Sequence, residues 1–374
     1  MARGIRIAKI LGIQIFIDYT WFIVFIFFAW SLSSGYFPFK SPGYGRLTYV
    51  LMGVTSSFLL FLCVLIHELS HSYTANRLGL NVSSITLFIF GGIAALENDP
   101  EKASIEFKTA IAGPIASGLL AVIFRGVSMV LAGQVPGPAL QVLDYLSFIN
   151  VLLFAFNMVP GFPLDGGRVL RALWWAWSGD KQKATMVASA IGKGFAFFLL
   201  ITGIMQLFTG NLTGGLWSIL IGVFLQQAAG NEYQHLLLKK SLENVSVAQM
   251  MSRDVVTIDG TVTINEAVEE FFLKHHFTSF PVASGGVVIG IVTLKAVRAV
   301  ERDKRGVTLV GDIMHRLSSE DMLKQEDPAY DALARIIKSE AGRLPVVEKG
   351  VLVGILSRKD IMRIIELRAG FHKD

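Results

Sequence analysis

Two histidines and one glutamate in a long apolar segment have the types and spacing of a metal-dependent hydrolase. They occur in the run His67-Glu68-Leu69-Ser70-His71, which matches the pattern H-E-x-x-H. Residues i and i+4 share one face of a helix, so His67 and His71 can offer ring nitrogens to one zinc ion. Glu68 lies about 100° around the helix from His67, which places it to take a proton from an attacking water rather than to bind the metal. The pattern predicts zinc-dependent hydrolysis of a peptide bond. The alternative is a polar cluster that joins neighbouring helices.

A catalytic zinc site needs a third protein ligand beside these two histidines. The remaining histidines lie in the charge-rich part of the chain, at positions 235, 275, 276, 315 and 372. The candidate in the apolar part is Asp165, within the run N-M-V-P-G-F-P-L-D-G-G at 157–167. The prolines and glycines of this run interrupt regular helix and let the backbone turn toward a site. We therefore expect one zinc ion per chain, bound by His67, His71 and Asp165. The alternative for Asp165 is a solvated or helix-capping carboxylate.

The composition divides the chain into two parts. Of 374 residues, 52% are hydrophobic and 17% are charged, whereas a soluble chain carries about a quarter charged residues. The long apolar stretches end near residue 230, and the sequence after them is mixed and charge-rich. We expect a membrane domain over 1–230 and a linker over 231–244, followed by a soluble domain. The net charge of +5 is not gathered into a basic stripe with aromatics, so nucleic-acid binding is not expected.

Six apolar segments approach the length of about 20 residues that a membrane-spanning helix needs. Their approximate bounds are 14–33, 51–73, 109–132, 139–159, 185–208 and 212–230. Lysine and arginine gather in the connections on one side of these spans, which predicts that this side is cytosolic. Both termini and the soluble domain would then be cytosolic, and the chain would be a multi-pass protein of the cell membrane. His67, His71 and Asp165 would lie at similar depth, near the cytosolic ends of the second and fourth spans.

The apolar run 85–96 is too short to span a bilayer, and Gly91-Gly92 divides it in two. Strand backbone cannot face lipid unpaired, so such a segment must pair with another or line a cavity. We expect a re-entrant β-hairpin here. The alternative is a short interfacial loop packed on the helices.

Two further side chains in the predicted spans are unusual. Arg125 lies in mid-span, where an internal ion pair and a lipid-facing side chain that reaches the interface are both open interpretations. Cys63, the one cysteine of the chain, precedes His67 by four residues and so shares its helix face. We favour core packing over metal ligation for Cys63.

Together, the two motifs of the apolar part resemble the site-2 protease family of intramembrane zinc metalloproteases. H-E-L-S-H in one predicted span is followed by N-x-x-P-x-x-P-x-D-G-G in another. The resemblance covers the whole membrane region. It implies that His67, His71 and Asp165 bind zinc and that Glu68 is the general base. It also implies that Asn157 lies near the cleavage centre and orients substrate or an oxyanion. The alternative for Asn157 is a hydrogen bond to an adjacent helix.

This resemblance extends to substrates and to other segments. It implies that the substrates are transmembrane proteins, and that the apolar hairpin is the edge strand that holds an unwound substrate extended. Ala112-Gly113-Pro114 resembles the Gly-Pro element that opens the third helix of the family.

The soluble part contains an internal repeat, with one copy over 245–301 and the other over 308–368. Each copy is expected to run helix, strand, strand, helix, with short β-runs bounded by glycine. The pair resembles a tandem CBS-domain module. That resemblance implies an adenine nucleotide bound between the copies and a homodimer formed through the module.

The nucleotide-binding signature of such modules is Gly-h-x-Thr/Ser-x-x-Asp, where h is hydrophobic. The second copy has it complete, with Ser357 and Asp360, whereas the first has Thr293 but Ala296 at the acidic position. The resemblance therefore implies at most one competent nucleotide site. The alternative is a module that serves only for dimerisation.

The predicted fold is an α-helical polytopic membrane protein, with about six transmembrane helices and a re-entrant β-hairpin, followed by an α/β tandem CBS module. The predicted function is zinc-dependent cleavage of peptide bonds within transmembrane segments, modulated by nucleotide. The alternative is a CBS-regulated transporter or channel with a structural metal site. That alternative does not explain why one helix carries H-E-x-x-H together with a depth-matched Asp165. A pseudoprotease is disfavoured because the base and all three ligands are present.

Overall fold

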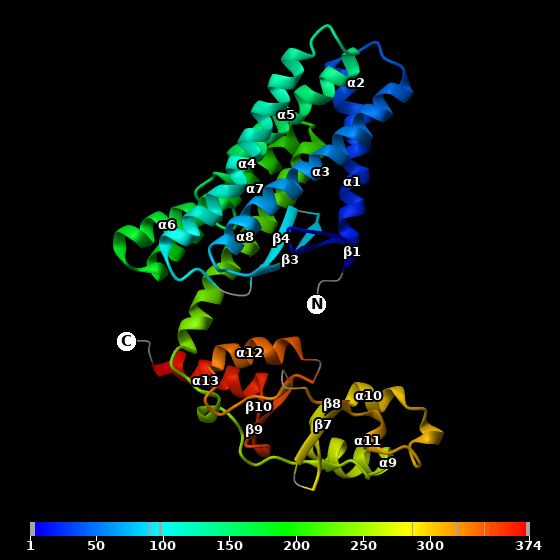
Figure 1. Ribbon diagram of the computed structural model, residues 1–374, viewed down its shortest axis with the longest axis vertical. Coiled ribbons are helices and arrows are strands. Elements are labelled where there is room, and N and C mark those ends of the chain that lie inside the picture. The colour runs from blue at the N-terminus through cyan, green and yellow to red at the C-terminus, as the bar shows by residue number, and fades with distance from the viewer. Residues whose placement is uncertain are drawn as a thin grey trace. The chain divides into compact units, whose positions relative to one another are not determined.

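The computed structural model describes residues 4–89, 91–96, 99–285, 287–318, 321–339 and 341–371. The chain divides into two compact units, Met1–Gln234 and His235–Asp374. The first is built mainly of long helices, and the second mixes short helices with small sheets (Figure 1).

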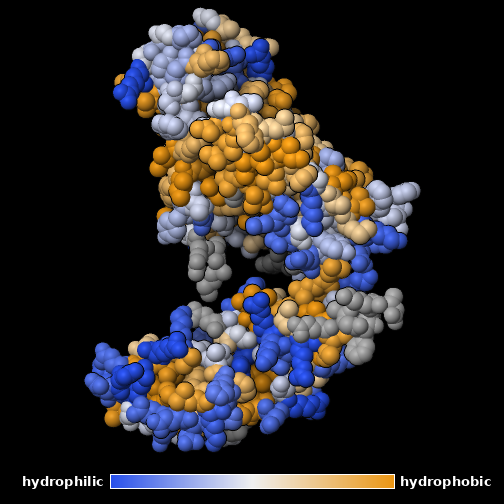
Figure 2. All heavy atoms as spheres, turned by 180° about the vertical axis from the view of Figure 1, so that it is seen from behind, coloured by the Kyte–Doolittle hydropathy of each residue, from blue (hydrophilic) through white to orange (hydrophobic). Residues whose placement is uncertain are grey.

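Six segments of the described chain are long and apolar enough to cross a membrane. The first, Tyr19–Lys40, comprises α1 (Tyr19–Ser31), a π-helical turn η1 (Leu32–Tyr36) and α2 (Phe37–Lys40). The others are single helices, namely α3 (Arg46–Arg77), α4 (Ala103–Val130), α5 (Gly137–Asn157), α7 (Lys181–Phe208) and α8 (Leu212–Ser241). On the face drawn in Figure 2, a band of hydrophobic residues crosses the middle of this unit, with more hydrophilic residues toward both ends. The structure therefore agrees with the predicted six spans.

Two expectations about these elements were wrong in detail. Residues 14–18, assigned to the first span, belong to a strand, and the helix begins only after Asp18 caps it by accepting from the Thr20 amide. Gly113-Pro114 lies inside α4 instead of opening it. Helix α8 continues into residues 231–241, so the first part of the predicted linker is helical. A further helix, α6 (Asp165–Ser178), follows α5 and was not predicted.

A four-stranded sheet packs beside the membrane helices in the order β1-β2-β3-β4. Its strands are β1 (Gly4–Ile10), β2 (Ile13–Asp18), β3 (Val82–Phe88) and β4 (Gly91–Leu96). The last two pair antiparallel, so the apolar run does form a hairpin, while its re-entrant position in the membrane stays a prediction. Ile13, Ile15 and Ile85 of the sheet are fully buried in one cluster with Leu65 of α3. The sheet is thereby fixed against the helix that carries the H-E-x-x-H motif.

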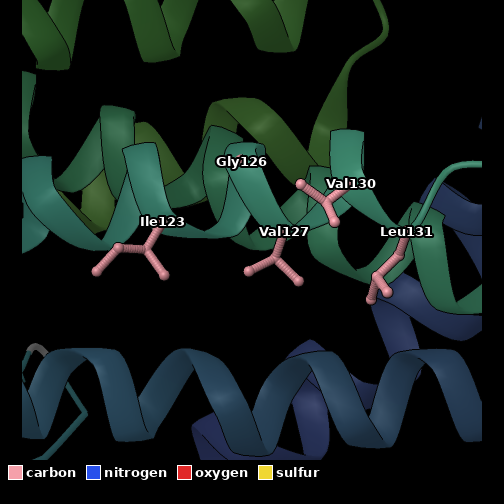
Figure 3. Close-up of a pocket in the computed structure, with 5 residues that line it drawn as sticks. All are labelled: Ile123, Gly126, Val127, Val130 and Leu131. Carbon is pink, nitrogen blue, oxygen red and sulfur yellow. The ribbon is translucent and has the colours of Figure 1, made fainter.

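A shallow hollow on the surface of α4 is lined only by apolar residues, namely Ile123, Gly126, Val127, Val130 and Leu131 (Figure 3). It begins ten residues beyond Gly113 along α4, which corresponds to about 15 Å of helix rise. The hollow has no group that could do chemistry, and it is separate from the H-E-x-x-H motif.

In the second unit, the two repeats exchange strands. The first copy contains β5 (Ile258–Asp259), α9 (Ile264–Glu266), η3 (Ala267–Leu273), β6 (Ser279–Ser284), β7 (Val287–Thr293) and α10 (Leu294–Ala299). The second contains α11 (Val310–Ile313), β8 (His315–Arg316), α12 (Ala329–Lys338), β9 (Arg343–Glu348), β10 (Val351–Ser357) and α13 (Arg358–Phe371). Strand β8 pairs with β7 of the first copy, and Ser252 forms the equivalent bridge to Ile355 of the second. This crossed pairing joins the copies into one module.

Candidate metal centre

Three side chains from two distant parts of the sequence meet at one point. His67 and His71 project from α3, and their Nε2 atoms lie 3.1 Å apart. Asp165, the first residue of α6, places Oδ2 3.1 Å from His67 Nε2 and 3.0 Å from His71 Nε2. A tetrahedral zinc ion with bonds of about 2.0–2.1 Å separates its ligand atoms by about 3.4 Å. The three donors therefore need to part by only a few tenths of an ångström to hold the ion.

The outer hydrogen bonds of the histidines leave their inner nitrogens free for a metal. His71 Nδ1 lies 2.7 Å from the carbonyl oxygen of Thr109 on α4. Because a carbonyl can only accept, Nδ1 carries the proton, and Nε2 of the neutral ring is left with its lone pair. His67 Nδ1 has a similar partner, Ser117 Oγ, at 2.9 Å. Thr109 and Ser117, which hold the two imidazole rings in place, were not predicted from the sequence. The Thr109 contact uses a backbone carbonyl, so no side chain could have indicated it.

Two opposing influences act on the pKa of the Asp165 carboxyl group. Burial raises it, whereas positive charge on His71 and His67 lowers it, with a net shift below the ordinary value, and a metal ion in place of those protons would lower it in the same way. The loop before Asp165 brings it into place, because the Phe162 amide donates to the Ala188 carbonyl of α7 at 3.1 Å. The prolines and glycines that suggested a turn here do mark a nonhelical segment between α5 and α6.

A glycine of α4 provides the space for an ion. A Cβ atom added to Gly113 would lie 2.2 Å from His71 Nε2 and 2.6 Å from His67 Nε2. Real Cβ atoms do not approach other atoms this closely. Only a residue without a side chain leaves room beside the donor atoms, which supports the fit of a metal to this site.

Glu68 lies against the β-hairpin. A Cβ atom on Gly92 of β4 would come within 2.4 Å of Glu68 Cγ and 2.7 Å of Glu68 Cδ. The glycine pair that breaks the apolar run therefore lets the hairpin backbone approach the predicted base. Asn157 ends α5, and its side-chain amide donates to the Leu153 carbonyl of the same helix at 3.0 Å. Its expected role toward substrate stays a prediction.

The chain is similar to known proteins over nearly its whole length. The model of peptidase family M50 matches residues 55–141 and 135–202, and the CBS-domain model matches residues 247–303 and 310–367. Rip3 of Mycobacterium tuberculosis, named as a zinc metalloprotease, is 32% identical over 370 residues, which are 98% of this chain and 94% of that protein. The chain belongs to peptidase family M50. As a member of this family, the site-2 protease family, it is a multi-pass membrane metalloprotease with a C-terminal pair of CBS domains.

Two further proteins are similar to this chain, one over nearly all of it and one over part of it. Zinc metalloprotease MJ0392 of Methanocaldococcus jannaschii is 28% identical over 371 residues, which are 98% of each chain. Among solved structures, a site-2 protease from Methanocaldococcus jannaschii is 29% identical and covers 62% of this chain and 95% of its own, with a TM-score of 0.43.

Arg125 takes part in an ion pair. Its Nη1 lies 2.9 Å from Asp144 Oδ1 of α5, and Ser128 Oγ donates to the same oxygen at 2.8 Å. Of the two interpretations left open by the sequence, the structure supports the ion pair. Cys63 is buried as expected, with 2% of its surface exposed.

In the CBS module, the predicted nucleotide residues cap the helices that follow β7 and β10. Asp360 Oδ2 accepts from Ser357 Oγ at 2.5 Å and from the Ser357 amide at 2.9 Å. Thr293 Oγ1 accepts from the Ala296 amide at 3.2 Å, and no carboxylate takes part there. Arg343 pairs with Ser357 in the register of β9 and β10 and was missed by the sequence reasoning. Burial lowers the pKa of the Arg343 guanidinium, and the nearby Asp360 carboxylate opposes this shift.

Proposed function

We propose that this M50 protein hydrolyses peptide bonds inside transmembrane segments of membrane proteins, with one zinc ion held by His67, His71 and Asp165. The observation that carries the proposal is the convergence of three donor atoms, 3.0–3.1 Å apart, beside a glycine that leaves space for an ion. Zinc bound there would supply a Lewis acid that activates water and polarises a peptide carbonyl.

The protein's own residues supply the other parts of the reaction. Glu68 follows His67 on the same helix turn and takes the proton of the attacking water, then returns it to the leaving amine. Strand β4 is the edge of its sheet. It holds the unwound substrate extended by backbone hydrogen bonds, as edge strands do for added peptides. Because Gly92 of β4 lies against Glu68, a peptide paired to this edge is brought to the base. Asn157 orients the substrate.

Removal and return of zinc tests this proposal. The full-length protein in lipid vesicles, with a set of single-span membrane proteins as substrates, should cleave only when zinc is bound. A chelator should stop cleavage, and stoichiometric zinc should restore it. The measurements are zinc content per chain and the substrate fragments by mass spectrometry. Cleavage that continues after the zinc has been removed would contradict the proposal, as would a purified protein that binds no zinc.

The orientation of the unit is part of the same proposal. Both termini and the CBS module face the cytosol, because lysine and arginine gather in the connections on the side of the chain ends. The metal centre then lies toward the cytosolic side of the membrane. In addition, the CBS module joins two copies of the chain into a homodimer.

An adenine nucleotide at the second CBS copy is proposed to modulate the protease. Ser357 directly precedes α13 and Asp360 lies in its first turn, where the helix N-terminus favours a phosphate group. The Arg343 guanidinium adjoins them. Asp360 accepts hydrogen bonds from the ribose hydroxyls, and Ser357 contacts phosphate. The first copy has Ala296 in place of the carboxylate, so one site per module is expected.

Replacement of Asp360 should weaken this binding. We expect Asp360→Asn to lower the affinity for ATP or AMP by about 10-fold to 100-fold, because hydrogen bonds to a charged group contribute about 1.5–3 kcal/mol. Titration calorimetry on the full-length protein measures the affinity for each nucleotide. The matched control is Asp321→Asn, since Asp321 accepts from the Ser318 amide and hydroxyl in the same capping geometry. Equal affinities for both variants and the parent would contradict the assignment.

A further inference from the structure

A buried ion pair joins the two elements that flank the metal centre. Glu106 in the first turn of α4 is fully buried, and the side chain of Arg171 on α6 is only 12% exposed. Both Nε and Nη2 of Arg171 lie 2.5 Å from the same oxygen, Glu106 Oε1. The guanidinium carbon also lies 4.7 Å from the centre of the Phe162 ring, in the loop that precedes Asp165. One guanidinium therefore fastens α4, α6 and the loop between α5 and α6.

Helices α4 and α6, which this ion pair joins, each carry a group of the metal site. Three residues after Glu106, on the same side of α4, Thr109 offers the carbonyl that orients His71. Asp165 begins α6, six residues before Arg171. A shift of α6 along α4 would therefore move the carboxylate away from the imidazoles. His67 and His71 share one helix and keep their spacing without help, whereas Asp165 depends on a tertiary contact.

The cost of this ion pair argues that it does more than stabilise the fold. A buried carboxylate loses its hydration, and apolar residues of the same volume are often at least as stabilising. Here the cost is not fully offset, because Glu106 Oε2 is buried and has no hydrogen-bond partner among the described residues. Buried charges are best attested as devices that fix the register of packed elements. Two guanidinium nitrogens directed at one carboxylate oxygen suit that task, since the planar group restrains direction as well as distance.

We infer that Glu106 and Arg171 are positioning residues that fix α6 against α4, so that Asp165 completes the metal site. This inference rests on the proposed function, because it takes His67, His71 and Asp165 as the zinc ligands. Neither residue touches the donor atoms. Both act through the elements on which Thr109 and Asp165 lie.

Metal binding by the full-length protein in detergent tests the inference. Glu106→Gln keeps the size of the side chain and removes its charge, and Arg171→Lys keeps the charge and removes the fork. We expect Glu106→Gln to weaken zinc binding about 10-fold to 100-fold, the range seen when an outer-shell partner is lost, because both changes displace a ligand without removing it. The zinc affinity of Arg171→Lys should lie between that of Glu106→Gln and that of the parent. In the cobalt-loaded protein, the intense visible bands of a tetrahedral site should weaken in the same order. In the double variant, the loss of zinc-binding free energy should be no larger than the sum of the losses in the two single variants.

The chain offers a matched control at the other end of α4. Asp144→Asn breaks the pair with Arg125, another arginine–carboxylate contact on this helix. It should leave zinc affinity and the cobalt spectrum within about twofold of the parent, because that pair holds no ligand-bearing element. A Glu106→Gln protein with parental zinc affinity and cobalt spectrum, whatever its thermal stability, would overturn the inference. A parent protein that binds no zinc would instead overturn the proposed function.

Discussion

Replacement of Gly113 by alanine should abolish zinc binding and proteolysis while the protein remains folded. The added methyl group would lie 2.2 Å from His71 Nε2 and 2.6 Å from His67 Nε2, which is the space that the ion needs. The imidazoles could relieve this contact only by turning away from Asp165. We therefore expect zinc affinity to fall by more than the roughly 100-fold that loss of an outer-shell partner costs. Zinc content per chain and cleavage of a transmembrane substrate measure the effect.

Gly118→Ala is the matched control, on the same helix. Its added Cβ would meet only Phe154 Cδ2, at an ordinary 3.6 Å. Both substitutions improve helix propensity equally, by about 1 kcal/mol in a helix interior. They differ in whether the methyl group meets the ligand atoms. The control should bind zinc and cleave substrate as the parent does. If Gly113→Ala also kept parental zinc affinity, the ion would not lie beside this glycine.

The parts of the site that were predictable from the sequence are those fixed by local geometry. The spacing of His67 and His71 sets their common face through helix periodicity alone, and Glu68 follows from the same turn. Asp165 was predictable because it lies in a run rich in proline and glycine that follows the fourth predicted span, at a depth similar to that of the two histidines. The repeat in the soluble part was equally visible, since glycine and β-branched runs recur in the same order.

The parts that were missed depend on contacts between distant segments. The ion pair of Glu106 and Arg171 joins residues 65 positions apart, and no periodicity connects them. The support for His71 comes from a backbone carbonyl, which every residue has. At the N-terminus, residues 14–18 were taken as the start of a span because they are mainly apolar. They belong to a strand that pairs with β3, and its alternate residues Ile13 and Ile15 are buried in one cluster with Leu65 of α3.

Glu68→Gln should separate metal binding from catalysis more sharply than any other change in this protein. Glutamine has nearly the same size and can still fill the space beside Gly92. It cannot accept a proton from water at neutral pH, however, so the general base is lost. We expect one zinc per chain, as in the parent, and a fall in cleavage rate of about 10²-fold to 10⁴-fold, the usual contribution of a positioned base. Single-turnover cleavage in lipid vesicles measures the rate, and metal analysis of the same sample measures zinc.

The shorter acid Glu68→Asp tests whether position as well as proton affinity matters. It keeps a carboxylate but withdraws it by one methylene from the hairpin, so its rate should lie between those of the parent and Glu68→Gln, with zinc again retained. Loss of zinc from either variant would mean that Glu68 takes part in binding the metal. Parental rates in Glu68→Gln would show that another group takes the proton. If both variants keep zinc and the cleavage rate falls from the parent to Glu68→Asp to Glu68→Gln, the result supports a role for the close contact between Gly92 and Glu68. A substrate strand paired to β4 meets the base because the hairpin has no side chain there to hold it away.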